Sequence, residues 1–211
     1  MEPFETSRKE GVVTQLINYA FSEVERKYGK GVGDGETPKS YHNLLHTKEV
    51  LTAAQQIAKK ALEAGKIGVA DIPLIEIAAS FHDIEQDLGS GNNERESARI
   101  AAEEMRKIGL KDEDVQKVKR MILATTVFFE NGVMKQSATD DYLTQVLADA
   151  DLSNLGQEPQ FYWERAQNLL REVGFIGEQA SFLENHRFYT EEAKRLFPHK
   201  KENIRYVQTK Q

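Results

Sequence analysis

The chain has 211 residues, of which 39% are hydrophobic, and this is enough apolar material for one well-packed core. Its formal net charge of -6, from 28 basic and 34 acidic residues, argues against an extended nucleic-acid-binding surface. The absence of cysteine excludes disulfide bonds, zinc–thiolate sites and a thiol nucleophile.

Targeting signals are not evident in the sequence. The first residues, Met1 to Glu5, lack the basic segment and the following apolar run of a secretion signal. No apolar run approaches the roughly 20 residues that are needed to cross a membrane. We therefore expect a single cytoplasmic domain, spanning residues 1–211, that has no membrane partner and no extended nucleic-acid partner.

Apolar residues recur at helical spacing in the first third of the chain. They predict one helix from about 7 to 28, ended by Gly29, and a second from about 43 to 64. The glycine-rich segment 29–38 between them lacks the Gly-Lys-Ser/Thr ending of a phosphate-binding loop. We expect it to form a flexible loop over the entrance of a functional site.

Two histidines lie at the start of the second predicted helix, in segment 41–46. Because His42 and His46 are four positions apart, their side chains would project from one face of a helix. Each histidine alone is as compatible with helix capping or core packing as with metal binding. The pair becomes informative only when further ligand residues are found in the chain.

The next predicted helix starts near Pro73, which suits a first helical turn, and its apolar run ends at His82 and Asp83. An imidazole and a carboxylate thus occupy consecutive positions. Both can reach one metal ion only if the backbone turns at this point. Segment 87–93 follows and predicts a loop, because it is rich in glycine and asparagine.

Helical patterns also cover the rest of the chain, and no run of alternating apolar and polar residues stands out. Strands are therefore expected to be few or absent. The predicted fold class is all-α, a single helical bundle. The remaining predicted helices span residues 94–108, 112–128, 140–155, 158–173, 177–183 and 190–207.

Two carboxylates, Asp149 and Asp151, lie in the mostly apolar segment 147–154, where unpaired charges are costly to bury. A bound metal ion would offset that cost. Two imidazoles and two carboxylates suit a divalent transition metal or magnesium with open positions for water. In chain order the candidate ligands are His46, His82, Asp83 and Asp151.

This order resembles the ligand pattern of the HD superfamily of metal-dependent phosphohydrolases, in which a histidine, a His-Asp pair and an aspartate follow one another. The likeness covers nearly the whole chain and is strongest to the small HD-domain hydrolases. It implies one compact HD-domain bundle, with a metal-binding core at about 40–155 and C-terminal helices at about 158–207. A local likeness to cyclic-nucleotide phosphodiesterases is confined to short motifs. The segments that carry these resemblances are 41–46, 81–87, 93–98, 149–156 and 182–203.

The resemblance implies hydrolysis of a phosphate ester by a water molecule that the metal activates. The cofactor would be one divalent ion, and its identity among manganese, magnesium, cobalt, nickel, iron and zinc stays open. By analogy with the phosphodiesterases, His42 is expected to be the general acid, since imidazole titrates near neutrality. Glu85 or Asp87, just after the His-Asp pair, is expected to orient or deprotonate the water.

Further residues are expected to support the ligands or contact the substrate. Asp149, two residues before Asp151, is a candidate for a weaker ligand or for a hydrogen bond to the ligands. Glu94, Arg95 and Ser97 match the Asn-Glu-x-x-Ser-Ala segment of the family and are candidates for pocket contacts. The expected partner is a small phosphorylated molecule, with a nucleotide as the leading candidate, and a homodimer is left open.

One departure from the family concerns segment 123–129, which lacks the histidines that supply a second metal in many HD proteins. This favours a site with a single tightly bound ion and weakens the alternative of an HD-type iron oxygenase. A non-catalytic module that binds a metal or a nucleotide is the other alternative. The intact ligand set favours a hydrolase, because a binding module needs no open water positions.

Overall fold

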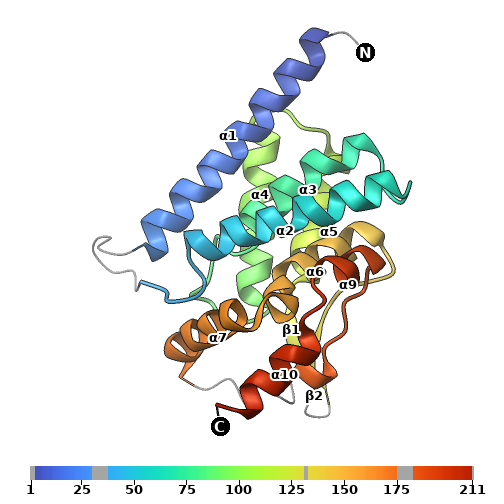
Figure 1. Ribbon diagram of the computed structural model, residues 1–211. Coiled ribbons are helices and arrows are strands. Elements are labelled where there is room, and N and C mark those ends of the chain that lie inside the picture. The colour runs from blue at the N-terminus through green and yellow to red at the C-terminus, as the bar shows by residue number, and fades with distance from the viewer. Residues whose placement is uncertain (1–2, 30–37, 131–132, 175–182, 211) are drawn as a thin grey trace.

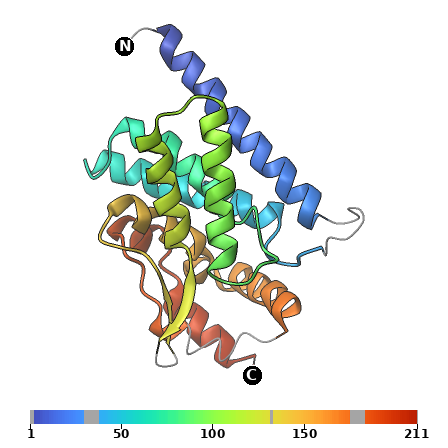
Figure 2. The ribbon, with the colours of Figure 1, turned by 180° about the vertical axis from the view of Figure 1, so that it is seen from behind.

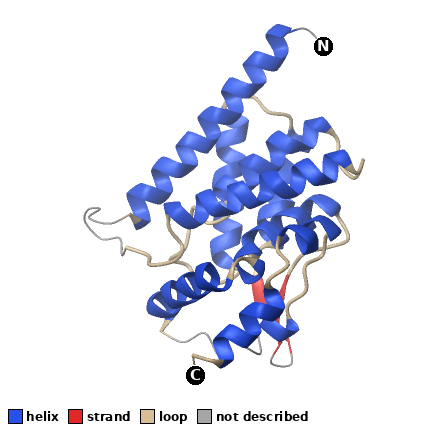
Figure 3. Ribbon diagram, in the orientation of Figure 1, coloured by secondary structure: helices blue, strands red, loops and turns tan. Residues whose placement is uncertain are grey.

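A computed structural model describes residues 3–29, 38–130, 133–174 and 183–210. These residues form an all-α fold, as the sequence predicts, with one small antiparallel hairpin (Figure 3). The elements up to the hairpin are α1 (Pro3–Tyr28), α2 (Leu44–Glu63), the 3-10 helix η1 (Val69–Asp71), α3 (Ile72–Phe81), α4 (Asn92–Lys107) and α5 (Asp112–Ala124). They are followed by β1 (Val127–Glu130), β2 (Val133–Gln136), α6 (Tyr142–Asp151), the 3-10 helix η2 (Ser153–Gly156), α7 (Pro159–Val173), α9 (Glu191–Leu196) and α10 (Lys200–Gln208).

The centre of the bundle is α3, which packs against α1, α2, α4, α5 and α6 (Figure 1). Its sequence explains this position, because nearly every residue of the run from Leu74 to Phe81 is apolar and buried. Seen from behind, α4 and α5 lie side by side and cover the far side of the bundle (Figure 2). One large apolar core therefore links the helices from α1 to α6.

A second, smaller core lies among η2, α7 and α10 at the C-terminal end of the molecule (Figure 1). Pro159 occupies the first turn of α7, where its missing N–H costs no helical hydrogen bond. The buried residues of this core are Leu155, Tyr162, Ala166, Leu183 and Val207. The domain thus has a main bundle and a C-terminal helical layer.

Three of the predicted helix boundaries are wrong. The helix predicted at 112–128 ends at Ala124, because the β-branched and aromatic residues that follow favour the strand β1. The helix predicted at 190–207 is interrupted between α9 and α10, where Pro198 cannot continue a helix. The helix predicted at 140–155 ends at Asp151 and continues as the 3-10 helix η2.

Two predictions fall mainly on residues outside the described ranges. They are the loop over the site entrance, because residues 30–37 are not described, and the helix predicted at 177–183. Within the described ranges, no helix combines the length and the apolar character that a membrane crossing requires.

Candidate metal site

Three helix ends of the main bundle bring the predicted metal ligands together. His46 lies in the first turn of α2, where the side chain of Asn43 caps the helix by accepting from the backbone N–H of Leu45 at 2.9 Å. His82 and Asp83 follow the last residue of α3, and Asp151 is the last residue of α6. Since α2, α3 and α6 pack against one another, all four side chains reach one point.

The donor atoms of these side chains are spaced like the ligands of one metal ion. Nε2 of His46 lies 3.3 Å from Oδ2 of Asp83 and 3.5 Å from Oδ1 of Asp151. Nε2 of His82 lies 3.1 Å and 3.6 Å from the same two oxygens. With metal–ligand bonds of about 2.1 Å, neighbouring ligands are separated by about 3.0 Å in an octahedron and about 3.4 Å in a tetrahedron.

The site is buried, and its central atoms have no other partner. The exposed fraction is 4% for His46, 0% for His82 and 8% for Asp83. Nε2 of both histidines and Oδ2 of Asp83 are buried without a hydrogen bond to any described residue. Buried polar atoms are rarely left unsatisfied unless a water or an ion completes them. His46, His82 and Asp83 could therefore hold a metal ion.

The charges within the cluster depend on one another. Burial opposes protonation of His82, but the neighbouring Asp83 and Asp151 outweigh this effect and raise its pKa. Burial likewise opposes ionisation of Asp83, and the facing histidines nevertheless hold its pKa well below the usual range. The two carboxylates thus stay ionised, which is the form that binds a cation.

Hydrogen bonds around the cluster orient the donor atoms. Nδ1 of His82 lies 2.8 Å from the backbone oxygen of Ala79 and donates to it, which leaves Nε2 as the ring nitrogen that faces the cluster. Gln86 donates from Nε2 to Oδ1 of Asp83 at 2.8 Å. Gln136 of β2 donates from Nε2 to Oδ2 of Asp151 at 3.2 Å. Each carboxylate therefore presents only its other oxygen to the histidines.

His42 lies beside the cluster and is held by a residue that the sequence did not indicate. Its Nδ1 lies 2.5 Å from Oε1 of Glu172, near the end of α7. The other oxygen, Oε2 of Glu172, accepts the backbone N–H groups of Tyr41 and His42 at 2.7 Å and 3.1 Å. The rings of His42 and His46 are 5.7 Å apart between centroids. Glu172 thus fixes both the backbone at Tyr41 and His42 and the orientation of the His42 imidazole.

The two carboxylates that were expected to act on water have other partners. Glu85 contacts Nζ of Lys27 at 2.9 Å and the hydroxyl of Tyr28 at 3.3 Å. Asp87 forms an ion pair of 2.8 Å with Lys39, and about half of its side chain is exposed. Both close the turn after the His-Asp pair, and neither lies among the clustered donor atoms.

Asp149 binds the segment that leads into α9 rather than the candidate ligands. Both of its oxygens accept backbone N–H groups at 2.8 Å, from Tyr189 and from Thr190 before α9. Burial raises the pKa of Asp149 to about 6, although these hydrogen bonds lower it. Both oxygens of its side chain are therefore engaged by residues just before α9.

The three candidates on α4 also have structural contacts. Ser97 is buried, and its Oγ accepts the backbone N–H of Glu85 at 3.2 Å, which supports the turn after the His-Asp pair. Glu94 accepts the N–H of Gly91 at 2.6 Å and so caps the start of α4. Arg95 is exposed and donates to Asn92 at 3.0 Å. None of the three contacts the clustered donor atoms.

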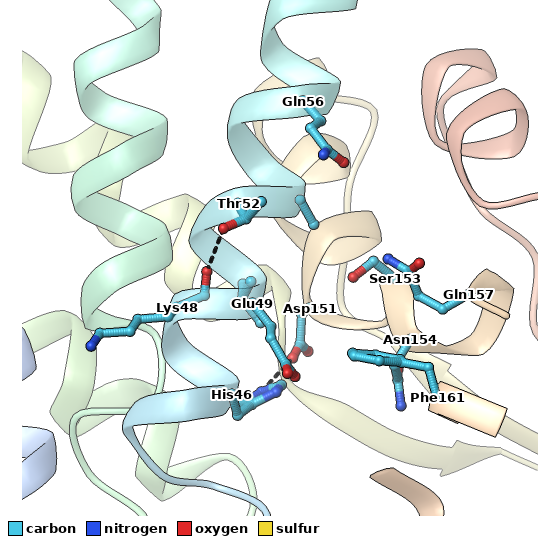
Figure 4. Close-up of a pocket in the computed structure, with 12 residues that line it drawn as sticks. His46, Lys48, Glu49, Thr52, Gln56, Asp151, Ser153, Asn154, Gln157 and Phe161 are labelled. Carbon is cyan, nitrogen blue, oxygen red and sulfur yellow. Dashed lines mark hydrogen bonds and ion pairs between the residues drawn. The ribbon is translucent and has the colours of Figure 1, made fainter. Parts of the chain in front are cut away.

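A cavity of about 220 Å³ opens beside the cluster (Figure 4). His46 and Asp151 lie together at its base, α2 forms one wall, and η2 with the start of α7 forms the other. Its polar and charged lining comprises His46, Lys48, Glu49, Thr52, Gln56, Asp151, Ser153, Asn154 and Gln157, and its aromatic lining is Phe161. The cavity gives a small molecule access to two of the four predicted ligands.

Comparison of the sequence with protein-family models gave no match, and a search of curated proteins found no relative. The function is therefore argued from the geometry of the site.

Proposed function

We propose that the protein is a metal-dependent phosphohydrolase of the HD superfamily, which hydrolyses an ester of a small phosphorylated molecule. The observation that carries this proposal is the convergence of two buried imidazole nitrogens, neither of which has a hydrogen-bond partner among the described residues, with two ionised carboxylates beside a cavity. When bound, a divalent ion supplies Lewis-acid activation of the phosphate and of water. The proposed ligands are His46, His82, Asp83 and Asp151.

The hydrogen bonds of the carboxylates support a single tightly bound ion. Oδ1 of Asp83 accepts from Gln86, and this hydrogen bond competes with a bridge from the same oxygen to a second ion. Manganese, magnesium, cobalt, nickel, iron and zinc all accept such a mixed nitrogen and oxygen set, and a site with open positions for water suits any of them.

His42 is the proposed general acid. Glu172 accepts from Nδ1 of His42, and this leaves Nε2 to hold the proton for the departing oxygen of the ester. Burial raises the pKa of Glu172, but the contacts with His42 outweigh this effect and lower it, so the carboxylate stays charged beside the imidazole. This pair favours an enzyme over a non-catalytic binding module, since a module needs no proton donor beside the metal ligands.

The proposal is tested by metal analysis and phosphate release on the same samples. The matched variants are His82→Gln, in the cluster, and His199→Gln, at a histidine that contacts Glu158 and Glu202 near the start of α10. After dialysis, the wild type and His199→Gln should each retain about one divalent ion per chain. His82→Gln should retain none, and its release of phosphate from a panel of phosphate esters should fall at least 100-fold, because second-sphere changes alone cost 10–100-fold.

Two results would count against the proposal. Full metal occupancy in His82→Gln would show that His82 is not a metal ligand. A wild-type protein that binds the ion tightly and releases phosphate from no ester would instead be a metal-binding module. Circular dichroism of all three proteins controls for loss of the helical fold.

A further inference from the structure

Part of the lining of the cavity beside the cluster is neutral and able to form hydrogen bonds. Gln56 faces it from α2, and Ser153, Asn154 and Gln157 face it from η2 and the residue that follows (Figure 4). Within the described part of the chain, none of these four side chains hydrogen-bonds to another residue, and Oδ1 of Asn154 is fully buried without a partner. Ser153 itself is only 6% exposed. A buried polar atom such as Oδ1 of Asn154 requires a partner, which a ligand can supply.

The charged groups around the cavity do not offer a site for a second phosphate. Glu49 lines the cavity, and its carboxylate is held at 2.9 Å by Nε of Arg165. The guanidinium of Arg165 also lies 4.7 Å from the ring centroid of Phe161, so it is engaged on both sides. Arg165 therefore already has two partners, Glu49 and Phe161, and supports the wall of the cavity.

Lys48 is the only lysine or arginine among the described residues that line the cavity, and its amine does not point into the cavity. The side chain points away from the cavity (Figure 4), and Nζ lies 5.6 Å from the ring centroid of Phe21 on α1. Only the apolar stem of Lys48 therefore contributes to the wall. Apart from the proposed metal ion at the base, no lysine or arginine side chain among the described residues that line the cavity is directed at an anionic group inside it.

We infer that the cavity binds a neutral, hydroxyl-rich group that carries a single phosphate, so that the substrate is a monophosphate of sugar-like chemistry rather than a bisphosphate or triphosphate. The inference rests on the proposed function for the position of the phosphate, which lies at the metal ligands. His46 and Asp151 form the base of the cavity, so the ester group of a phosphate held there extends between α2 and η2. A volume of about 220 Å³ suits a group smaller than a drug-sized ligand.

Asn154 and Ser153 are assigned to hydroxyl recognition. The unpaired Oδ1 of Asn154 accepts from a hydroxyl, and the Ser153 hydroxyl donates or accepts as its partner requires. A site built to hydrogen-bond a ligand discriminates strongly against an analogue that lacks the group, because its own polar atoms are then left unpaired. Aryl phosphates should therefore bind more weakly than sugar phosphates of similar size.

The test is calorimetric binding to the manganese-loaded protein, with hydrolysis measured in parallel. The probes are glucose 6-phosphate against fructose 1,6-bisphosphate, ribose 5-phosphate against phenyl phosphate, and AMP against ATP. Each singly phosphorylated sugar compound should bind at least ~10-fold more tightly than its partner in the pair, a factor equal to about 1.4 kcal/mol. Asn154→Leu should weaken binding of ribose 5-phosphate by ~10-fold, the loss of about one hydrogen bond.

A variant that adds a positive charge to the cavity wall provides a second test of this substrate class. Gln157→Lys places the missing cation at the cavity wall and should improve binding of fructose 1,6-bisphosphate by ~10-fold relative to glucose 6-phosphate. Gln160→Lys is the matched control, because Gln160 lies on the exposed side of α7 and outside the cavity lining. It should leave both affinities unchanged.

Equal or tighter binding of the bisphosphates by the wild type would overturn the inference, as would an unchanged affinity in Asn154→Leu. The two proposals fail separately. Selective binding of sugar monophosphates without hydrolysis would remove the proposed enzyme and keep the ligand class, whereas metal-dependent hydrolysis that favours bisphosphates would do the reverse.

Discussion

At the residue scale, two glutamines decide which oxygen of each clustered carboxylate faces the histidines. Gln86 holds Oδ1 of Asp83, and Gln136 holds Oδ2 of Asp151. A carboxylate with one oxygen engaged offers the other in a fixed direction, which lowers the entropy lost when a metal binds. Gln136 is 7% exposed, so its amide is buried with the cluster.

Replacing Gln136 by leucine should therefore weaken metal binding without removing any ligand. The amide donor is lost, the Asp151 carboxylate rotates more freely, and the dissociation constant for manganese should rise by roughly 10-fold or more. Calorimetric titration of the dialysed protein measures this value. Gln116→Leu, which removes a partly exposed glutamine that contacts Asp112 on α5, is the control and should keep the wild-type affinity. Equal affinities in the two variants would make Gln136 a packing residue only.

At the scale of elements, the C-terminal layer is tied to the helix end that carries Asp151. Gly156 ends η2, and its backbone oxygen accepts the N–H of His199, just before α10, at 3.1 Å. The chain passes Gly156 so closely that an added Cβ would lie 2.2 Å from the backbone oxygen of Phe197. Only glycine permits this approach, because any side chain would push the two segments apart.

Gly156→Ala should consequently lower the free energy of unfolding by about 1–3 kcal/mol, as is typical of overpacking against backbone. Gly11→Ala gives a matched comparison on α1, where a Cβ would meet nothing within 4 Å. That change should stabilise the protein by about 0.5–1 kcal/mol, because alanine favours a helix interior. Urea denaturation measures both effects. A similar sign for the two variants would show that the contact at Gly156 relaxes freely.

At the scale of the whole molecule, the two apolar cores meet around the cavity. The wall formed by α2 belongs to the main bundle, and the wall formed by η2 and α7 belongs to the C-terminal layer. The layers are joined by the ion pairs of Glu172 with His42 and of Arg165 with Glu49. The relative placement of the layers therefore decides the shape of the cavity.

The acid stability of the whole protein should depend on His186, which is 7% exposed before α9. Burial lowers its pKa to about 3, with Lys200 and Arg187 adding to the shift and Asp151 opposing it. In the unfolded chain a histidine has a pKa of about 6.5. The unfolded state thus binds more protons between pH 6.5 and 3, and stability falls as the pH drops through this range.

Urea denaturation at pH 7 and pH 5 should reveal this contribution. His186→Gln lacks the titrating group, so between the two pH values it should lose less stability than the wild type, by up to about 2 kcal/mol. The difference between the two proteins isolates the histidine from all other titrating groups. Parallel loss of stability in both would mean that His186 is solvated in the folded state.

The sequence by itself determined the all-α fold class, most helix positions and the candidate ligand set. These follow from local physics, because apolar periodicity, caps such as Asn43 and breakers such as Gly109 act within a few residues. The four candidate ligands could be named because their side-chain chemistry and order are visible in the chain. The ends of α5 and α9 were harder to place, since strand propensity and a single proline compete there with helical periodicity.

Only the tertiary structure decided which carboxylates lie among the histidines and which do not. Glu85 was a candidate base and Asp149 a candidate for a weaker ligand, yet Lys27 and Thr190, each far away in the sequence, engage them elsewhere. The contact between Glu172 and His42 could not be predicted for the same reason, because 130 positions separate the two residues. Contacts of this kind arise from how the helices pack, and no local pattern encodes them.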